Sequence, residues 1–294
     1  MSDFINYLLN GVFIGTLYAL VAMGFVVIYR ASKVFNFAQG ELVAFGGFLV
    51  WWTVIAQGLP LWIALPMAFA MAAVFGWLIE RIFFSRLVGE SIFSMVMVTI
   101  GLLILIRGLI IVLFGAEVKP FPAIFNTRPI ILGDIIISRS GLYGAILTLV
   151  IGLALSWFFN RTTSGLRMTA VAEDHQIAMS LGVSVRRSLI FAWILGAVIS
   201  VVAAIVFLSG RSINPLTSEI GMAALPVALL AGLESVGGLL LAGLIVGIAQ
   251  GLGTGYLDPL VGGAVGAVLP YFIMLAVLFI KPTGLFGWET IERV

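Results

Sequence analysis

The fold is decided by two stretches of sequence, Phe35-Asn-Phe-Ala-Gln-Gly-Glu41 and Ile213-Asn-Pro-Leu-Thr-Ser-Glu219. Each places an apolar residue before an asparagine and a glutamate five positions after it, and each opens a short apolar segment. Asparagine caps helices and tolerates turns, whereas a carboxylate near lipid is costly unless it faces protein or water. We therefore predict interrupted membrane helices at Asn36 and Asn214. Glu41 and Glu219 should face the interior, beside a basic residue or backbone amides.

The role of this repeated pattern has three open interpretations. The two glutamates anchor re-entrant turns, contact a passing solute, or share their spacing by coincidence. Arg107, inside another apolar segment, is a further costly charge. We expect its side chain either to extend to the surface or to pair inside the bundle.

The chain around these stretches is mostly apolar. Of its 294 residues, 62% are hydrophobic and 10% are charged, whereas soluble domains have about 25% charged residues. Since a membrane span needs about 20 apolar residues, we predict an all-α polytopic integral membrane protein with about eight or nine transmembrane helices. A single membrane domain covers residues 1–294. The predicted spans are 6–29, 42–57, 61–79, 92–114, 142–159, 189–208, 220–233, 236–252 and 261–280.

The basic residues predict the orientation of these spans. Ten Lys and Arg residues, from Arg30 to Arg293, fall on one side, and four fall on the other. Because cytoplasmic loops retain basic residues, the first side should be cytoplasmic and the N-terminus should lie outside. The two asparagine stretches then enter from opposite sides, which is typical of an inverted-topology repeat. Its approximate halves are 1–114 and 139–280, with an outer loop over 115–138 and a cytoplasmic coupling loop over 160–187.

Both loops have predicted structure. In the outer loop, two β-branched runs around Gly133-Asp134 predict a hairpin, which either caps helix ends or docks an external partner. In the cytoplasmic loop, residues 170–183 predict one helix, capped by Thr169 and ended by Gly182, with acidic residues in its first turns. This helix either lies on the membrane or fits a groove on a soluble partner. Its predicted apolar stripe consists of Val171, Ile177, Ala178 and Leu181.

Four glycines recur at every fourth position near the end of the chain: Gly243, Gly247, Gly251 and Gly255. This spacing places them on one helix face, and small faces allow helices to approach closely in lipid. The pattern predicts helix packing, either within this chain, against a partner chain or along a path through the bundle.

Several classes of chemistry are disfavoured by composition. The chain has no Cys, one His and no Gly-x-x-x-x-Gly-Lys-Ser/Thr loop, which argues against thiolate chemistry, His-rich metal sites and P-loop nucleotide binding. A net charge of +2 does not suggest a nucleic-acid partner. The composition therefore disfavours these enzyme classes, and we predict no catalytic residue, no metal and no cofactor held by this chain.

Further motifs occur in register along the chain: Gly165-Leu-Arg-Met-Thr-Ala-Val-Ala-Glu-Asp174, Ala178-Met-Ser-Leu-Gly-Val183, Phe35-Asn-Phe-Ala-Gln-Gly-Glu-Leu42, Ile79-Glu-Arg81, Gly232-Leu-Glu-Ser-Val-Gly-Gly238 and Lys281-Pro-Thr-Gly-Leu-Phe-Gly287. Together they resemble the LivH-type permeases of branched-chain amino acid ABC importers. Two residues depart from the family pattern, Gln39 where many relatives have His and Gln250 where many have Glu.

This resemblance implies a permease subunit in the bacterial inner membrane that moves branched-chain or other small apolar amino acids inward by alternating access. The implied partners are a second permease subunit of LivM type, as a heterodimer, two cytoplasmic ATPases that carry ATP and Mg, and an external solute-binding protein. The family role in ATPase coupling falls on Arg167, Glu173, Asp174, Ala178, Leu181 and Gly182. The transport path or the anchors of the interrupted helices fall on Asn36, Gln39, Glu41, Asn214 and Glu219.

Other functions remain open on the sequence. One is a stand-alone ion-coupled secondary transporter, in which Glu41 or Glu219 carries protons. Another is the same importer family acting on urea, amides or aromatic acids. An intramembrane enzyme is disfavoured, because the spans lack paired His or Asp motifs.

Overall fold

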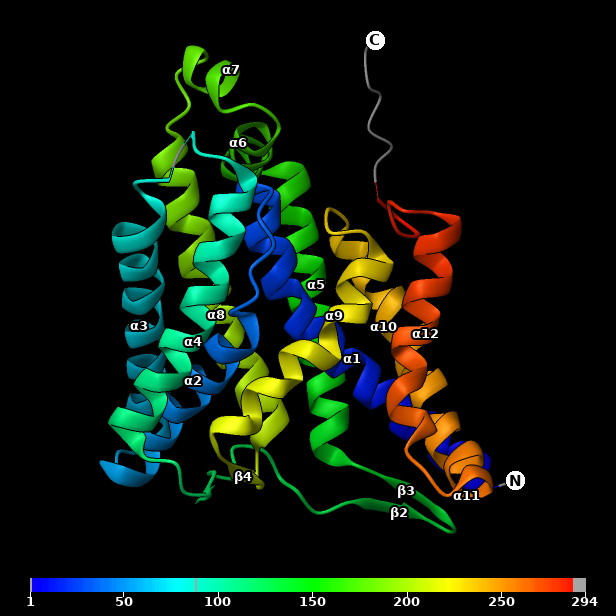
Figure 1. Cartoon of the computed structure of the whole chain (residues 1–294). Helices are drawn as coiled ribbons and strands as arrows, with labels where there is room; N and C mark the ends of the chain where they lie inside the picture. The colour runs from blue at the N-terminus through cyan, green and yellow to red at the C-terminus, as the bar shows by residue number, and fades with distance from the viewer. Residues whose placement is uncertain (1, 88, 288–294) are drawn as a thin grey trace.

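A computed structural model describes residues 2–87 and 89–287 and shows a bundle of helices (Figure 1). The helical segments are α1 (Ser2–Ser32), α2 (Gln39–Trp51), η1 (Trp52–Ala56), α3 (Leu61–Ile79), η2 (Glu80–Phe84), α4 (Ile92–Phe114), α5 (Arg139–Arg161), α6 (Thr163–Glu173), α7 (His175–Ser180), α8 (Val185–Leu208), η3 (Pro215–Glu219), α9 (Ile220–Ala231), α10 (Val236–Leu252), η4 (Gly253–Leu257), α11 (Asp258–Val261) and α12 (Val265–Ile280). The strands are β1 (Lys119–Pro120), β2 (Ile130–Leu132), β3 (Ile135–Ile137) and β4 (Ser212–Ile213). The all-α polytopic class is confirmed.

The predicted spans all correspond to helices. Within the described residues, seven helices are long and apolar enough to cross a membrane, and two shorter apolar helices, Pro215–Ala231 and Val265–Ile280, account for the remaining spans. Several boundaries move. The second span begins at Gln39 rather than at residue 42, and the last begins at Val265 rather than at residue 261. The π-helical turns η1, η2 and η4 lengthen α2, α3 and α10 without breaking them.

The longest helix, α1, runs through the middle of the bundle and packs against α10. The glycines of α10 and η4 face it, because a Cβ built on Gly247 would lie 2.3 Å from the Gly15 Cα and one on Gly251 would lie 2.7 Å from the Gly11 Cα. A Cβ on Gly243 would lie 2.5 Å from the Gly15 oxygen, and one on Gly255 would meet the Tyr7 ring at 2.5 Å. The glycine repeat therefore packs two helices of this same chain.

Two interrupted helices enter the bundle from opposite ends (Figure 1). After α1, residues 33–38 turn back into the bundle before α2 begins, and α2 then runs to the end that carries the outer loop. After α8, residues 209–219 enter from that outer end, and α9 runs the other way. Each unit is thus an irregular segment followed by a short helix, and the two units have opposite directions.

The basic residues divide between the two ends of the bundle as the span order requires, and which end is cytoplasmic stays a prediction. The segments that hold the basic residues from Arg30 to Lys281 lie at the end with α6 and α7, which we call the cytoplasmic end (Figure 1). The four basic residues of the other side lie at the outer end, with β2 and β3: Lys119, Arg128, Arg139 and Arg211. The tenth cytoplasmic residue, Arg293, lies outside the described residues.

The outer end carries the predicted hairpin. β2 pairs antiparallel with β3, with Leu132 opposite Ile135. Asn6 of α1 holds the hairpin against the helix through two hydrogen bonds. Its Nδ2 donates to the Asp134 carbonyl at 3.0 Å, and its Oδ1 accepts from the Ile136 N–H at 3.0 Å. A second short pairing, β1 with β4, was not predicted and ties the outer loop to the segment that precedes η3.

Candidate functional site

The starts of the two interrupted helices touch near the middle of the bundle. A Cβ built on Gly40 would lie 2.1 Å from the Ser218 carbonyl oxygen and 3.1 Å from the Gly221 Cα. One built on Gly221 would lie 2.5 Å from the Gly40 Cα. Only glycine allows backbones to approach this closely. The arrangement is the one expected where discontinuous helices of an inverted repeat meet.

Asn36 and Gln39 organise the first start. The Asn36 Oδ1 accepts from the Ala38 N–H at 3.1 Å, and the Asn36 carbonyl accepts from the Gln39 N–H at 3.1 Å. The Gln39 Nε2 donates to the Ser200 Oγ of α8 at 2.9 Å. Both Asn36 and Gln39 are fully buried. These bonds satisfy polar groups that would otherwise be costly to bury, and they fix the turn that opens α2.

Glu41 pairs with Arg107 of α4. Arg107 Nη2 lies 2.7 Å from Glu41 Oε1, and the Arg107 Nε donates to the same oxygen at 2.9 Å. Arg107 Nη2 also donates to the Ser218 Oγ in the second unit, at 3.1 Å. The Glu41 side chain is 2% exposed, whereas that of Arg107 is 43% exposed. The expected basic partner of Glu41 is therefore Arg107, which pairs inside the bundle and links both interrupted helices.

The second unit is more open. The Asn214 N–H donates to the Thr217 Oγ1 at 3.2 Å and starts η3. Glu219, at the end of η3, is exposed and forms no ion pair or hydrogen bond through its side chain among residues 2–87 and 89–287. The expectation that Glu219 faces a buried interior with a partner is wrong. Because α9 begins directly after it, its carboxylate is left at the edge of a cavity.

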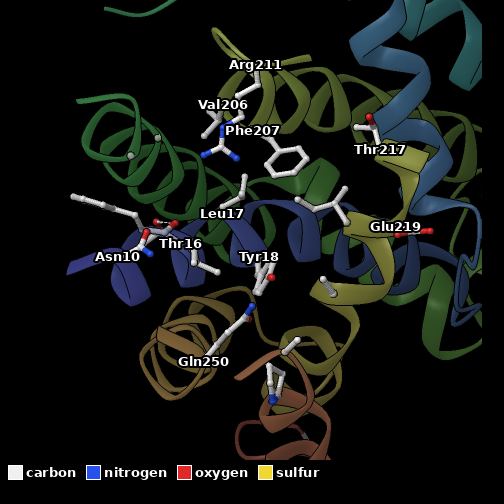
Figure 2. Close-up of a pocket in the computed structure, with 18 of the residues that line it drawn as sticks. Asn10, Thr16, Leu17, Tyr18, Val206, Phe207, Arg211, Thr217, Glu219 and Gln250 are labelled. Atoms are coloured by element: carbon white, nitrogen blue, oxygen red, sulfur yellow. Dashed lines mark hydrogen bonds between the residues drawn. The ribbon is translucent and has the colours of Figure 1, made fainter. Parts of the chain in front are cut away.

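This cavity has a volume of about 910 Å³ and opens among α1, α5, α8, η3, α9, α10 and α12. Figure 2 shows Arg211 and Phe207 on one wall and Tyr18 and Gln250 on the opposite wall. The Arg211 guanidinium stacks over the Phe207 ring, 5.5 Å from its centre, and has no carboxylate partner within the described residues. The Gln250 side chain interacts with the Tyr18 hydroxyl, but its buried Oε1 has no hydrogen-bond partner in the described part.

A smaller cavity of about 50 Å³ lies beside the ion pair. It is lined by Glu41, Arg107 and Ser218, and it shares Glu219 and Met222 with the large cavity. The sequence-predicted Glu41 and Glu219 thus lie beside adjoining spaces.

The cytoplasmic loop forms two helices rather than the single predicted one. α6 begins at Thr163, where the Thr162 Oγ1 accepts from the Gly165 N–H at 3.1 Å, so Thr169 is not the cap. Asp174 then interrupts the helix, because its Oδ1 accepts from the N–H groups of Gln176 and Ile177 at 2.7 and 2.9 Å and starts α7. Glu173 therefore ends α6. Gly182, with φ of 77°, closes α7 as predicted.

The break divides the predicted apolar stripe. Val171 and Ala178 are buried, whereas Ile177 and Leu181 are 59% and 75% exposed. Met179 is also exposed at 53%. The tip of the loop therefore presents an apolar surface of Ile177, Met179 and Leu181 at the cytoplasmic end. Arg167 of α6 is exposed beside Gly182 and Arg187 in a shallow pocket.

Lys33 connects this loop to the rest of the cytoplasmic end. Its Nζ lies 2.8 Å from the Glu173 Oε1 and is also bonded to Glu234. Burial lowers the pKa of Lys33, but the bonds to the two carboxylates more than offset this and raise the pKa above its usual value of 10.5. Lys33 therefore keeps its charge at neutral pH.

Sequence reasoning missed Lys33, Arg211, Tyr18 and the pairing of Glu41 with Arg107. Arg211 and Lys33 entered only as charges at span ends, and nothing in a single sequence places distant residues together. Two residues singled out in the sequence do line the large cavity: Glu219, through the Asn-to-Glu spacing, and Gln250, as a departure from the family pattern.

A polytopic helical bundle with two oppositely directed interrupted helices that meet at a charged pair is typical of a membrane transport protein. Residues 7–278 match the family described as branched-chain amino acid transport system, permease component. The chain belongs to this family, and it is a multi-pass membrane transport subunit.

Its relatives match it over almost their whole length. The high-affinity branched-chain amino acid transport system permease protein LivH of Escherichia coli K12 is 28% identical over 99% of this chain and 98% of its own. BraD of Pseudomonas aeruginosa, named in the same way, is 25% identical with the same coverage. A probable LivH of Methanocaldococcus jannaschii is 27% identical over 95% of this chain and 91% of its own. Among solved structures, PsaBC from Streptococcus pneumoniae in complex with Fab aligns with a TM-score of 0.46 and 15% identity over 96% of this chain and 93% of that chain, a likeness too weak to bear on the fold.

Proposed function

We propose that the chain is the permease subunit of an ATP-binding cassette importer for branched-chain or other small apolar amino acids, in a bacterial cytoplasmic membrane. The observation that carries this proposal is the Arg107–Glu41 pair at the meeting point of two interrupted helices, in a chain whose family match covers residues 7–278. The names of the relatives supply the substrate class.

The half-exposed Arg107 side chain supports our assignment of the face that lines the conduit. An arginine within a membrane-spanning helix is costly in contact with lipid and is normally turned to protein or to water. The same face carries Glu219 and the exposed side chains of Phe37 and Met222. We assign this face to the transport path, which the second permease subunit, of LivM type, completes from the other side.

The large outer cavity fits a free amino acid. Arg211 offers a cation for an α-carboxylate. Glu219, across the cavity from Arg211 and shared with the smaller cavity, offers an anion for the α-ammonium group as the solute moves inward. Phe207, Leu216 and Met222 supply apolar surface for an aliphatic side chain. This subunit would thus receive the solute from an external binding protein and pass it inward along Glu219.

The driving force would come from outside this chain. In our proposal two cytoplasmic ATPases hold ATP and Mg, and each permease subunit contacts one of them. The exposed Ile177, Met179 and Leu181 at the tip of α7 suit an apolar groove on such a partner, and Arg167 and Asp174 provide charged flanks. ATPase closure would move α6 and α7, and alternating access would follow.

The stand-alone secondary transporter is not favoured, because the relatives are named as permease proteins of transport systems and the matched family is a permease component. The proposal has two versions that differ in substrate: an importer of small apolar amino acids, or an importer of the same family for other solutes. Urea, short amides or aromatic acids would use the same fold with a different solute.

The test is transport in proteoliposomes that contain this chain with the second permease, the ATPases and the binding protein encoded alongside it. We expect ATP-dependent leucine uptake that excess valine suppresses and that urea, acetamide and phenylacetate do not. Uptake by this chain alone, driven by an ion gradient without ATP, would overturn the proposal. Leu181→Asp should abolish ATPase attachment, whereas Leu181→Met, which keeps the apolar surface, should not.

A further inference from the structure

One cation holds three separate parts of the cytoplasmic end together. Lys33 directly follows α1 and begins the segment that leads into the first interrupted helix. Its Nζ binds Glu173, the last residue of α6, and Glu234, which lies in the turn after the second interrupted helix. The side chains of Lys33 and Glu234 are 25% and 19% exposed, whereas that of Glu173 is 58% exposed, so solvent screens the contact with Glu173 more than the contact with Glu234.

The backbone of Lys33 is specialised for this position. It has a φ of 53° and is the only residue other than glycine with a positive φ in the described ranges 2–87 and 89–287. Residues with a Cβ seldom adopt this conformation. Here it ends α1, where the Lys33 N–H donates to the Tyr29 carbonyl at 2.7 Å, and sends the chain back into the bundle.

We propose that Lys33 is the positioning residue that transmits movement of the coupling loop to both interrupted helices at once. This inference rests on the proposed coupling of the loop to an ATPase. A displacement of α6 moves Glu173, and the shared cation carries the displacement to the segment before α2 and to the turn after α9. Without the Lys33 cation, the carboxylates of Glu173 and Glu234 face each other and repel, so a displacement of α6 is no longer carried through this point.

The loop has a second attachment to α1, through Arg30, which also interacts electrostatically with Glu234. Arg30 Nη2 donates to the Thr169 Oγ1 at 3.3 Å, and the guanidinium stacks on the Phe159 ring at 4.3 Å from its centre. Loss of Lys33 should therefore leave α6 in place and the complex assembled. Only the transmission should fail.

The test is a set of variants in the full complex, reconstituted in proteoliposomes and measured for leucine uptake and ATP hydrolysis together. Lys33→Asn removes the cation but suits a positive φ, because asparagine tolerates this conformation. We expect unchanged ATPase attachment and thermal stability, retained hydrolysis, and a fall of about tenfold in leucine transported per ATP, within the usual range for coupled sites. Lys33→Arg should retain coupling.

The charge exchange Lys33→Glu with Glu173→Lys keeps one cation and two carboxylates at this point and should restore most of the coupling that Lys33→Glu alone loses. Arg161→Asn, which removes an exposed cation at the end of α5, is the matched control and should change nothing. Normal transport per ATP in Lys33→Asn would overturn the inference. If the wild-type complex itself shows no ATP-dependent uptake, the proposed function fails instead.

Discussion

The two interrupted helices share a sequence pattern but have different surroundings. In the first, the polar residues are buried, with exposures of 0% for Asn36, 0% for Gln39 and 1% for Glu41. Glu41 also forms an ion pair with Arg107. In the second, Asn214 is half-buried and Glu219 is exposed, without a partner in the described part of the chain, beside a large cavity. A buried and paired carboxylate stabilises structure, whereas an open and unpaired one is free to bind. We therefore expect the first unit to anchor the fold and the second to meet the solute.

The largest effect is expected where α1, which leads into the first unit, contacts α10, which follows the second. Gly247→Leu forces a side chain into backbone that a Cβ alone would approach to 2.3 Å. We expect a cost of more than about 3 kcal/mol, because overpacking strains both helices, and no folded protein should accumulate. The measurement is the yield of monodisperse protein in detergent. Gly237→Leu on the same helix, where no atom lies within 4 Å, is the control and should give normal yield.

The ion pair of Glu41 with Arg107, which we expect to anchor the first unit, is broken by Arg107→Met. This change leaves the Glu41 carboxylate buried without its cation, for which the expected cost is about 3–5 kcal/mol. A lowered midpoint of thermal unfolding in detergent checks it. The double variant Glu41→Gln with Arg107→Met removes both charges and should recover much of the loss. Equal stability of Arg107→Met and the wild type would show that the pair does not anchor the first unit.

The contact between the two units is tested by a smaller change, Gly40→Ala. The added methyl group would lie 2.1 Å from the Ser218 carbonyl oxygen, so the two helix starts must separate. We expect a loss of about 1–3 kcal/mol, read from the same thermal transition. Gly101→Ala on α4, which has no atom within 4 Å of the new methyl group, should leave that transition unchanged or raise it slightly.

The smallest effect on stability, and the sharpest on transport, is expected for Glu219→Gln. Since Glu219 is exposed and unpaired in the described structure, stability should change by less than about 0.5 kcal/mol. The leucine concentration for half-maximal uptake should rise, because the ammonium group loses its anion. Glu41→Gln should show the reverse, with a lower unfolding temperature as its main effect. If Glu219→Gln and Glu41→Gln changed the unfolding temperature and the half-maximal leucine concentration in the same way, the two units would not differ in role.

Local patterns predicted much of this structure. Apolar length located the spans, the Asn-to-Glu spacing located both interrupted helices, and Gly133-Asp134 located the outer hairpin. The failures arose where a side chain competes with the backbone or where tertiary contacts decide. Asp174 was placed inside a helix, but its carboxylate caps the next one instead. Arg107 and Glu41 are 66 positions apart, and only the fold brings them together.

The first turns of α2 and α9 meet through glycines, and this has a consequence for how the two helices can move. Gly40 and Gly221 contribute only main-chain atoms to their contact. Two smooth surfaces of this kind slide or pivot without any rotamer having to change, and so without the barrier that interlocked side chains impose. We therefore expect the two helix starts to pivot against each other at this junction, while the Arg107 side chain stays bonded to Glu41 on one side and Ser218 on the other.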